Sequence, residues 1–362
     1  MGIKKNNFRI LIAPLDWGLG HTTRCIPIIK YLLLNQYTVF VGANETIKKI
    51  IRKEFPDIPV LPLQGYNIRY SKSKRGLPFK ILLQLPKILL SIRNEKKWLK
   101  KKVEELKIDL VISDNRFGLY TKKVRSIFIT HQLQILIPNK LLQSFIQKIN
   151  YSYINRYTEC WIPDFEGKMN LAGALSHPKK YPAVPVKYIG PLSRLKKTDP
   201  EEKKVDWLVV LSGPEPQRTI LEHKILSVAG LTDEKILIVR GKPIAEDNLT
   251  VPANCTVVNH LSGDELEKAY AQSAFVLSRS GYTTVMEVLM LQKKAVLIPT
   301  PGQTEQEYLA RHLSQQKWCY TFDQNTEDFL GEMNKAKEFP YRLPTFSASS
   351  YEEVIEDFLA TL

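Results

Sequence analysis

Cysteine is scarce in this 362-residue sequence, and the cysteines that are present form no motif. They are far apart and none has CxxC spacing, which argues against a disulfide framework and against a metal site built from thiolates. Such thiols are typical of a reducing cytoplasm. The four residues are Cys25, Cys160, Cys255 and Cys319.

A long apolar run is also missing. A membrane-spanning helix needs about 18 apolar residues, whereas the best candidate, residues 81–92, is interrupted by Pro86 and Lys87. The basic start MGIKKNN precedes an apolar run that ends at Asp16, which is short for a secretory signal. We therefore expect a cytoplasmic protein that can lie peripherally on the inner face of the cell membrane.

Acidic residues are few in the first half of the chain. Up to Gly190 there are 33 Lys and Arg against 12 Asp and Glu, a net charge of +21. The remainder has 19 against 25, a net of −6, and the two add to the overall +15. This asymmetry favours a negatively charged partner for the N-terminal half. No helix-turn-helix, zinc or RNP-type motif is present, so we expect no nucleic acid partner.

Short apolar, β-rich runs alternate with helical patterns along the whole chain. Buried parallel strands have continuous apolar runs of this kind, and the alternation predicts parallel sheets with helices on both faces. The expected strands lie at 9–15, 37–43, 109–115, 125–132, 206–213, 235–241, 255–261, 274–281 and 294–301.

The chain is long enough for two domains. We expect an α/β protein with two doubly wound, Rossmann-like domains, residues 1–190 and 205–345, joined by the polar, proline-containing linker 191–204. Residues 346–362 form an amphipathic helix that Ser349 or Ser350 can cap and that can cross back to the first domain. Ligands of such sheets lie at the carboxyl ends of the strands, which predicts a site in a cleft between the domains.

The segment 72–102 combines eleven Lys and Arg with one acid, Glu95, and interleaved apolar residues. A basic amphipathic helix of this composition suits an anionic membrane surface. An ordinary surface helix with a solvated lysine face is the alternative. The charge of the whole half favours a membrane or a phosphate-bearing acceptor.

The stretch GLGH, residues 18–21, joins an apolar strand to a helical pattern. It lacks the third glycine of the dinucleotide fingerprint, so it gives little support for an NAD site, and an ordinary turn also explains it. His21 falls in the first helical turn. The helix dipole there disfavours protonation and leaves an imidazole able to accept a proton.

Two other strand ends in the first half carry polar side chains. A carboxylate that orients a histidine makes a general base, so His21 with Asp114 is the candidate catalytic dyad. The alternative is that Asp114 pairs with Arg116 or caps a turn. The neighbours assigned to the acceptor side of the site are Gly18, Gly20, Arg24, Asn115, Arg116, His131 and Gln132.

Residues 278–313 follow the order strand, glycine turn, helix, strand, proline loop and helix. The first backbone N–H groups of the helix after the glycine, together with two threonine hydroxyls, form a site suited to a diphosphate. A glutamate in this helix can accept hydrogen bonds from a ribose, and the loop 300–307 can contact sugar hydroxyls. The residues concerned are Gly281, Thr283, Thr284, Glu287, Glu305 and Gln306.

Over most of its length the sequence resembles the nucleotide-sugar glycosyltransferases of the GT-B fold, in particular family 28. The matching motifs are WGLGHTTR, FITHQ, IGPLSR, PTPGQTEQEY and, over some thirty positions, NHLSGDELEKAYAQSAFVLSRSGYTTVMEVL. The type member adds N-acetylglucosamine to the lipid-linked peptidoglycan precursor. The resemblance therefore implies an enzyme that uses a UDP-sugar.

By position, the resemblance also implies roles for individual residues. Two of them flank the uracil, Glu287 holds the ribose, and three residues of the proline loop hold the donor sugar. The remaining residues lie beside the nucleotide and its phosphates. The residues carried over are His260 and Leu261 for uracil, Arg194, Arg279, Ser280 and Gly281 for the phosphates, and Glu305, Gln306 and Glu307 for the sugar.

Two departures from the family pattern stand out. The second glycine-rich loop is LSGPEPQR, in which Pro214 and Pro216 remove N–H donors, so Ser212, Gly213 and Arg218 are expected to take over. Glu307 replaces a family glutamine, which affects the choice of sugar.

GxGHxxR also resembles a second branch of the fold, the UDP-sugar hydrolases of the pseudaminic acid pathway. We expect a glycosyltransferase without metal or cofactor that acts on a lipid-linked or membrane-proximal acceptor in cell-surface glycan or glycolipid synthesis. A UDP-sugar hydrolase and a non-catalytic UDP-sugar-binding module are the alternatives.

Overall fold

The computed structural model describes residues 8–66, 77–137, 139–197, 202–242, 249–346 and 350–362, with the side chains of 77–83 and 85 outside this description. The chain divides into two compact units. Unit 1 contains the described residues of Met1–Arg69, Phe79–Leu192 and Ser347–Leu362. Unit 2 contains those of Tyr70–Pro78 and Ser193–Phe346.

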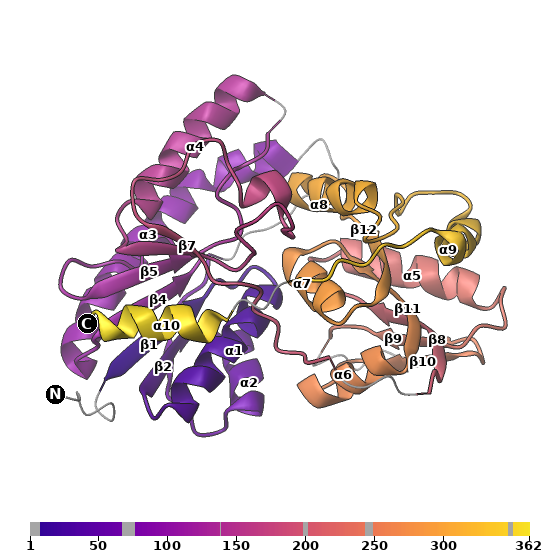
Figure 1. Cartoon of the computed structure of the whole chain (residues 1–362), viewed down its shortest axis with the longest axis horizontal. Coiled ribbons are helices and arrows are strands. Elements are labelled where there is room, and N and C mark those ends of the chain that lie inside the picture. Colours follow the sequence, from indigo (N-terminus) through magenta and orange to yellow (C-terminus); the bar gives the residue numbers. More distant parts are fainter. Residues whose placement is uncertain (1–7, 67–76, 138, 198–201, 243–248, 347–349) are drawn as a thin grey trace. The chain divides into compact units, whose positions relative to one another are not determined.

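Unit 1 is built on a seven-stranded sheet in the order β3-β2-β1-β4-β5-β6-β7, in which neighbouring strands are parallel (Figure 1). The strands are β1 (Arg9–Pro14), β2 (Thr38–Ala43), β3 (Val60–Pro62), β4 (Leu110–Asp114), β5 (Arg125–Ile129), β6 (Glu159–Ile162) and β7 (Val186–Tyr188). The helices are α1 (Gly20–Leu34), α2 (Glu45–Glu54), α3 (Leu77–Leu106), α4 (Lys140–Ile154) and α10 (Tyr351–Ala360), with a short 3₁₀ turn, η2 (Gly173–Leu175).

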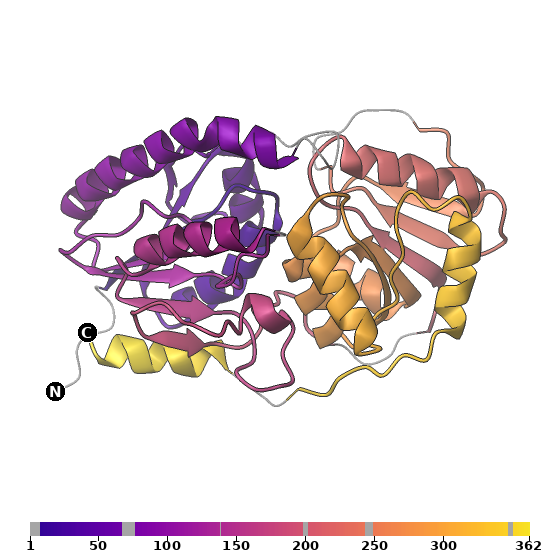
Figure 2. The same ribbon diagram turned by 90° about the horizontal axis from the view of Figure 1, so that it is seen from above.

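Helices cover both faces of this sheet (Figure 2). The face with Ile10 and Ile112 packs against α1, α2 and α10. The opposite face packs against α3 through Leu11 and Val111, and against the end of α4 through Phe128. Successive residues of a strand point to opposite faces, and because both faces are buried each strand is apolar throughout.

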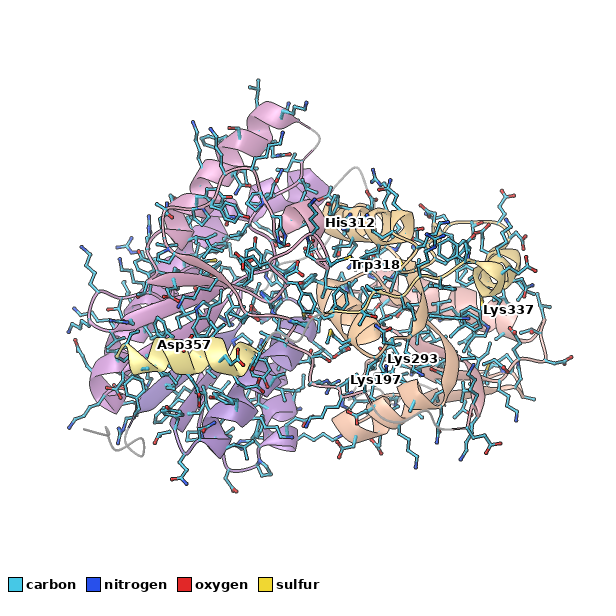
Figure 3. The ribbon with its side chains drawn as sticks, in the orientation of Figure 1. Lys197, Lys293, His312, Trp318, Lys337 and Asp357 are labelled. Carbon is cyan, nitrogen blue, oxygen red and sulfur yellow. The ribbon has the colours of Figure 1, made fainter. Side chains whose placement is uncertain are left out.

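The C-terminal helix α10 belongs to unit 1. The Ser350 hydroxyl accepts a hydrogen bond from the backbone N–H of Glu353, as expected for an N-cap. Ile355 and Phe358 are buried in the same core cluster as α1, whereas Asp357, labelled in Figure 3, is exposed. The helix therefore returns to the N-terminal sheet.

Unit 2 is built on a five-stranded parallel sheet in the order β10-β9-β8-β11-β12. Its strands are β8 (Val205–Val210), β9 (Ile236–Val239), β10 (Cys255–Val258), β11 (Ser273–Arg279) and β12 (Lys294–Ile298). Its helices are α5 (Gln217–Ala229), α6 (Gly263–Ala271), α7 (Tyr282–Met290), α8 (Thr304–Gln315) and α9 (Phe329–Glu338). The helix α6 begins with a complete capping box in which Ser262 and Glu265 bond each other's backbone N–H.

The expected α/β architecture of two doubly wound parallel sheets is confirmed. All nine strands expected from apolar runs are present, but β3, β6 and β7 lay outside that expectation. These three strands have only three or four residues each, and each contains a proline or a charged residue, so no continuous apolar run marks them.

Candidate functional site

The first group of site residues lies at the carboxyl ends of adjacent strands in unit 1. Pro14 at the end of β1 pairs in register with Asp114 at the end of β4, which pairs with Ile129 at the end of β5. His21 follows on the first turn of α1 and His131 lies two residues beyond β5. Parallel pairing therefore brings together residues that are about a hundred positions apart in the sequence.

His21 and Asp114 are in contact. The Nδ1 atom of His21 lies 3.2 Å from Oδ2 of Asp114. The His21 side chain is 14% exposed, whereas the Asp114 side chain is fully buried. The predicted dyad is thus close enough for a hydrogen bond.

Arg24, one turn further along α1, is 1% exposed. It contacts Asp114, His21 and His131, and these four residues form the polar cluster of unit 1. Its Nε donates to Asp114 Oδ2 at 2.9 Å and its Nη2 donates to Asp114 Oδ1. Nη1 lies 3.0 Å from His131 Nδ1 and Nη2 lies 2.8 Å from His21 Nδ1. Because a guanidinium only donates, His131 Nδ1 accepts, and a neutral His131 has its proton on Nε2.

These contacts set the charges of the cluster. Burial lowers the pKa of His21, the Arg24 charge lowers it further, and the nearby Asp114 only partly opposes them. Burial alone would raise the pKa of Asp114, but the Arg24 charge and the hydrogen bonds from His21 and Arg24 outweigh it and hold that pKa well below its usual range. The cluster is an ionised carboxylate, a permanent cation and a His21 that resists protonation.

Arg116 is not a partner of Asp114. It is fully buried and donates to the Pro14 carbonyl at 2.8 Å, the Gln64 carbonyl at 3.2 Å and Glu95 Oε1 at 2.7 Å. The alternative in which Asp114 pairs with Arg116 is therefore wrong. Arg116 instead ties the end of β1 to α3.

The remaining acceptor-side residues shape the turns around this cluster. Gly18 has a φ of 82°, which favours glycine because it has no Cβ. Gly20 begins α1, and its carbonyl accepts a hydrogen bond from the Thr23 hydroxyl at 3.1 Å. Asn115 has a φ of 57°, and its N–H donates to the Ile129 carbonyl at 3.0 Å. Gln132 is half-buried next to His131.

Sequence reasoning did not assign a role to Glu95 or Tyr66. Glu95 is 3% exposed, and its Oε2 accepts from the Tyr66 hydroxyl at 2.8 Å and the Gly118 N–H at 3.0 Å. Burial raises the pKa of Glu95 although Arg116 opposes it. The sequence did contain a sign of this role, because Glu95 is the one acidic residue among the eleven Lys and Arg of 72–102.

The second group of site residues lies in unit 2 around the start of α7. Gly281 is the N-cap of this helix, and an added Cβ there would meet no atom within 4 Å. Thr283 and Thr284 in the first turn are half-buried. The Ser280 hydroxyl donates to the Gln306 carbonyl at 2.9 Å. The first turn of α7 therefore offers backbone N–H groups beside a position without a side chain.

Glu287 and Arg194 form an ion pair in unit 2, with Arg194 Nε 3.7 Å from Glu287 Oε1. Their side chains are 9% and 11% exposed. Burial raises the pKa of Glu287, and the Arg194 charge counteracts this. Two residues assigned to different parts of the nucleotide are thus neighbours in unit 2.

Arg279 at the end of β11 is 1% exposed and bonded to the protein itself. Its Nη2 donates to the Gln217 carbonyl at 2.6 Å and to Gln324 Oε1 at 2.7 Å. Its Nη1 lies 3.3 Å from the Pro299 carbonyl. Burial lowers the pKa of Arg279 to about 10. This geometry is that of a residue that holds the neighbouring loops together.

The loop LSGPEPQR, residues 211–218, turns at Gly213, which has a φ of 97°. Ser212 is half-buried. Arg218 Nη1 donates to the Arg240 carbonyl at 3.0 Å, and its Nη2 pairs with Glu215. Arg218 is therefore anchored inside unit 2.

The proline loop before α8 is held by its own side chains. Gln306 is 8% exposed; its Oε1 accepts from the Thr300 N–H at 2.9 Å, and its Nε2 donates to Gln303 Oε1 at 2.6 Å. Glu307 Oε1 accepts from the Gly302 N–H at 3.0 Å. Glu305 is half-buried on the first turn of α8.

A hollow of about 420 Å³ lies beside this loop. Its lining includes Pro299, Glu307, Arg311 and Asp323. His260 and Leu261, which follow β10, are half-buried at another strand end of the same sheet. The unit thus has polar groups at the ends of several strands.

Within the described ranges, no three His, Cys, Asp or Glu side chains gather closely enough to hold an ion. None of the helices in the part of the chain that the structure covers is long and apolar enough to cross a membrane.

Comparison with known proteins assigns the C-terminal half first. Residues 208–336 match the model of the glycosyltransferase family 28 C-terminal domain. A relative from Methanosarcina acetivorans, described as an uncharacterized glycosyltransferase, is 24% identical over 330 residues, which cover 83% of this chain and 81% of the relative.

Solved structures extend the likeness to the whole chain. Arabidopsis thaliana UGT89C1, solved with UDP-L-rhamnose, has a TM-score of 0.63 at 13% identity, with 99% of both chains covered. Acinetobacter baumannii MurG has a TM-score of 0.57 at 14% identity, covering 98% of this chain and all of MurG. The family 28 domain, the relative and the shared fold together identify the chain as a glycosyltransferase of the GT-B fold, related to family 28.

Proposed function

We propose that this glycosyltransferase moves a sugar from a UDP-sugar to an acceptor hydroxyl without a metal ion, with His21 as the general base. The contact between His21 and Asp114 at the strand ends of unit 1 is the observation that carries this proposal. A positioned base contributes about 10²–10⁴ in rate. The chemistry requires a neutral His21, and its lowered pKa supports that state.

The base role has a specific requirement for the position of the proton. A neutral His21 accepts a proton at Nε2 only when its own proton is on Nδ1, where it donates to Asp114 Oδ2. Arg24 Nη2, at 2.8 Å, competes for Nδ1, because an N–H donated there would leave the proton on Nε2. The catalytic state is therefore the one in which Asp114 accepts the Nδ1 proton.

The donor is proposed to bind to unit 2. The start of α7 supports a diphosphate there, because the first N–H groups of a helix and its dipole favour an anion. Glu287 in the same helix is proposed to accept hydrogen bonds from the ribose, and His260 with Leu261 to contact the uracil. Arg194 is proposed to bind the phosphates after leaving its ion pair with Glu287.

The remaining donor contacts are proposed around these groups. Glu305 and Glu307 are proposed to bind the sugar beside the hollow that Glu307 lines. Gln306 and Arg279 hold the loops from within, since their side chains already bond to the protein. Stabilisation of the leaving diphosphate by the helix start and Arg194 makes a metal unnecessary. The UDP-L-rhamnose bound in the UGT89C1 structure supports a UDP-sugar as the donor class.

The acceptor is proposed to be lipid-linked or close to a membrane, with the enzyme peripheral on the cytoplasmic face. The basic half of the chain, with its net charge of +21 up to Gly190, supports an anionic surface as a partner. Part of the segment 72–102 lies outside the described residues, and its visible part is the long helix α3. Exposed lysines on α3 include Lys87, Lys96 and Lys97.

A ligand panel tests the donor. The melting temperature is measured with UDP, other nucleotides and several UDP-sugars, with and without EDTA. A donor at about 100 times its dissociation constant stabilises the fold by about 2.7 kcal/mol, and we expect this shift to be unaffected by EDTA. No shift with any UDP compound would contradict the donor assignment.

UDP release then tests the reaction. With the donor from the panel, we expect slow UDP release in water and rapid release with a lipid-linked acceptor. Equally fast release of free sugar and UDP without acceptor would show a hydrolase. Donor binding without turnover on any acceptor would show a binding module.

A further inference from the structure

The helix α4 (Lys140–Ile154) in unit 1 packs into the core through Ile154 in its last turn, but its earlier turns expose apolar side chains. Four large apolar side chains on its outer side are exposed: Leu141 by 85%, Leu142 by 48%, Phe145 by 62% and Ile149 by 42%. Residues 141, 145 and 149 are four positions apart, so they form one stripe along the helix. In Figure 1 α4 extends away from the strands of unit 1.

Before Ile154, amide side chains of α4 face the protein. Gln147 Oε1 accepts from the Ile135 N–H at 2.9 Å, and its Nε2 donates to the Leu133 carbonyl at 2.6 Å. Gln143 Oε1 accepts from the Ile137 N–H at 3.2 Å. Asn150, which is 7% exposed, donates to the Leu133 carbonyl at 3.4 Å.

This polarity has a physical consequence. The amides fix α4 to the segment before it through hydrogen bonds, so the outer apolar residues are not needed to hold the helix in place. An apolar stripe left in water loses the stabilisation that burial of these side chains would give. Contiguous exposed apolar surface of this kind marks an interaction site.

Charge identifies the partner. No Asp or Glu occurs between Asp114 and Glu159, while six Lys and Arg do besides the buried Arg116. Lys140 and Lys148, both exposed, lie on α4 itself. Cations beside an apolar stripe suit a surface with negative headgroups above acyl chains.

We infer that the outer face of α4 inserts Leu141, Phe145 and Ile149 into the headgroup region of an anionic membrane. Leu89 and Leu90 on α3 of the same unit are also exposed, by 54% and 58%. The inference deepens the proposed function by naming the element that contacts the membrane. It does not depend on the sugar-transfer reaction, since lipid binding requires neither donor nor acceptor.

Vesicle binding tests the inference with the full chain. Sedimentation is measured with phosphatidylglycerol–phosphatidylcholine vesicles and with phosphatidylcholine alone, at low and high salt. We expect binding to the anionic vesicles, and we expect the triple variant Leu141→Gln, Phe145→Gln, Ile149→Gln to bind about 100-fold more weakly. The matched control is Leu34→Gln with Leu231→Gln, which changes leucines exposed by 73% and 70% elsewhere.

A second readout reports insertion directly. The variant Phe145→Trp should show a blue-shifted emission with anionic vesicles and quenching by brominated acyl chains. No vesicle binding by the wild type at low salt, or equal binding by the triple variant, would overturn the inference.

The inference would also be overturned if the wild type were a dimer in solution and the triple variant a monomer, because the stripe would then bind a second copy of the chain. Turnover on a water-soluble acceptor analogue should be unchanged in the triple variant. If the wild type turned over no donor with any acceptor, the proposed function would be contradicted, but the result of the vesicle experiment would still stand.

Discussion

Arg24 and Asp114 form a buried, two-point ion pair: Nε of Arg24 donates to Oδ2 of Asp114 at 2.9 Å, and Nη2 donates to Oδ1. Both side chains are at most 1% exposed. The same carboxylate contacts His21. A base that depends on Asp114 therefore also depends on Arg24, which neutralises the carboxylate without protonating it.

Removing the Asp114 charge should destabilise the fold. In Asp114→Asn the Arg24 cation stays buried without its counter-charge, and breaking such a pair costs about 3–5 kcal/mol. The free energy of unfolding, measured in urea by the fluorescence of unit 1, checks this value. In the double variant Arg24→Met, Asp114→Asn, at least half of the loss should be recovered, since neither charge of this pair remains. A loss below about 1 kcal/mol in Asp114→Asn would show that water reaches the pair.

His21→Ala should separate catalysis from binding. We expect turnover to fall by about 10²–10⁴, while the dissociation constant for UDP, measured by calorimetry, stays within about twofold. His223→Ala is the control, because this histidine is exposed on α5. Loss of UDP binding in His21→Ala, or unchanged turnover, would contradict the base assignment.

The pH dependence of the reaction should reflect a depressed His21 pKa. Because burial and Arg24 lower that pKa from 6.5, the base stays neutral down to a lower pH. We expect the acid limb of kcat/KM to lie below pH 6.5. An acid limb at or above pH 6.5 would exclude His21 as the group that titrates.

The free energy of unfolding should also depend on the protonation of His21, and it should fall as the pH is lowered. The unfolded chain protonates His21 at about its ordinary pKa of 6.5, whereas the folded chain does so only at lower pH. The unfolded state then binds more protons in that interval, so the free energy of unfolding falls as the pH drops below 6.5. His21→Gln should flatten this part of the stability profile, measured by urea unfolding from pH 7 to pH 5.

The tautomer of His21 can be observed directly. The base proposal expects its proton on Nδ1, donated to Asp114, whereas His131 should carry its proton on Nε2, because its Nδ1 accepts from Arg24. Long-range ¹⁵N–¹H correlation spectra of the six histidines distinguish the two forms. A proton on Nε2 of His21 in the ligand-bound enzyme would make it a donor and would rule out its action as a base.

Glu287→Gln should weaken binding of the donor without changing binding of the acceptor. Hydrogen bonds to a charged group contribute about 1.5–3 kcal/mol, so we expect the dissociation constant for UDP to rise about tenfold or more. The exposed Glu338→Gln on α9 is the control. An unchanged UDP affinity in Glu287→Gln would show that Glu287 serves only to hold Arg194.

The sequence by itself determined the two parallel sheets. Strands buried on both faces have to be apolar throughout, and the nine longer runs are strands. The starts of α6 and α10 are also determined by nearby sequence, because the Ser262 and Ser350 side chains accept hydrogen bonds from N–H groups three residues further along. The short strands β6 and β7 depend on pairing with neighbours and left no such signal.

Only the tertiary structure decided which polar residues meet. The sequence placed Asp114 at a strand end, favoured His21 as its partner and left Arg116 as the alternative. In the folded chain α1 also brings Arg24 to Asp114, and Arg116 bonds to Glu95 instead. The exposure of the apolar stripe on α4 could likewise not be predicted, since a periodic pattern gives the two faces of a helix but not which one packs against the protein. That choice depends on hydrogen bonds to residues 133–137, which only the folded chain brings within reach.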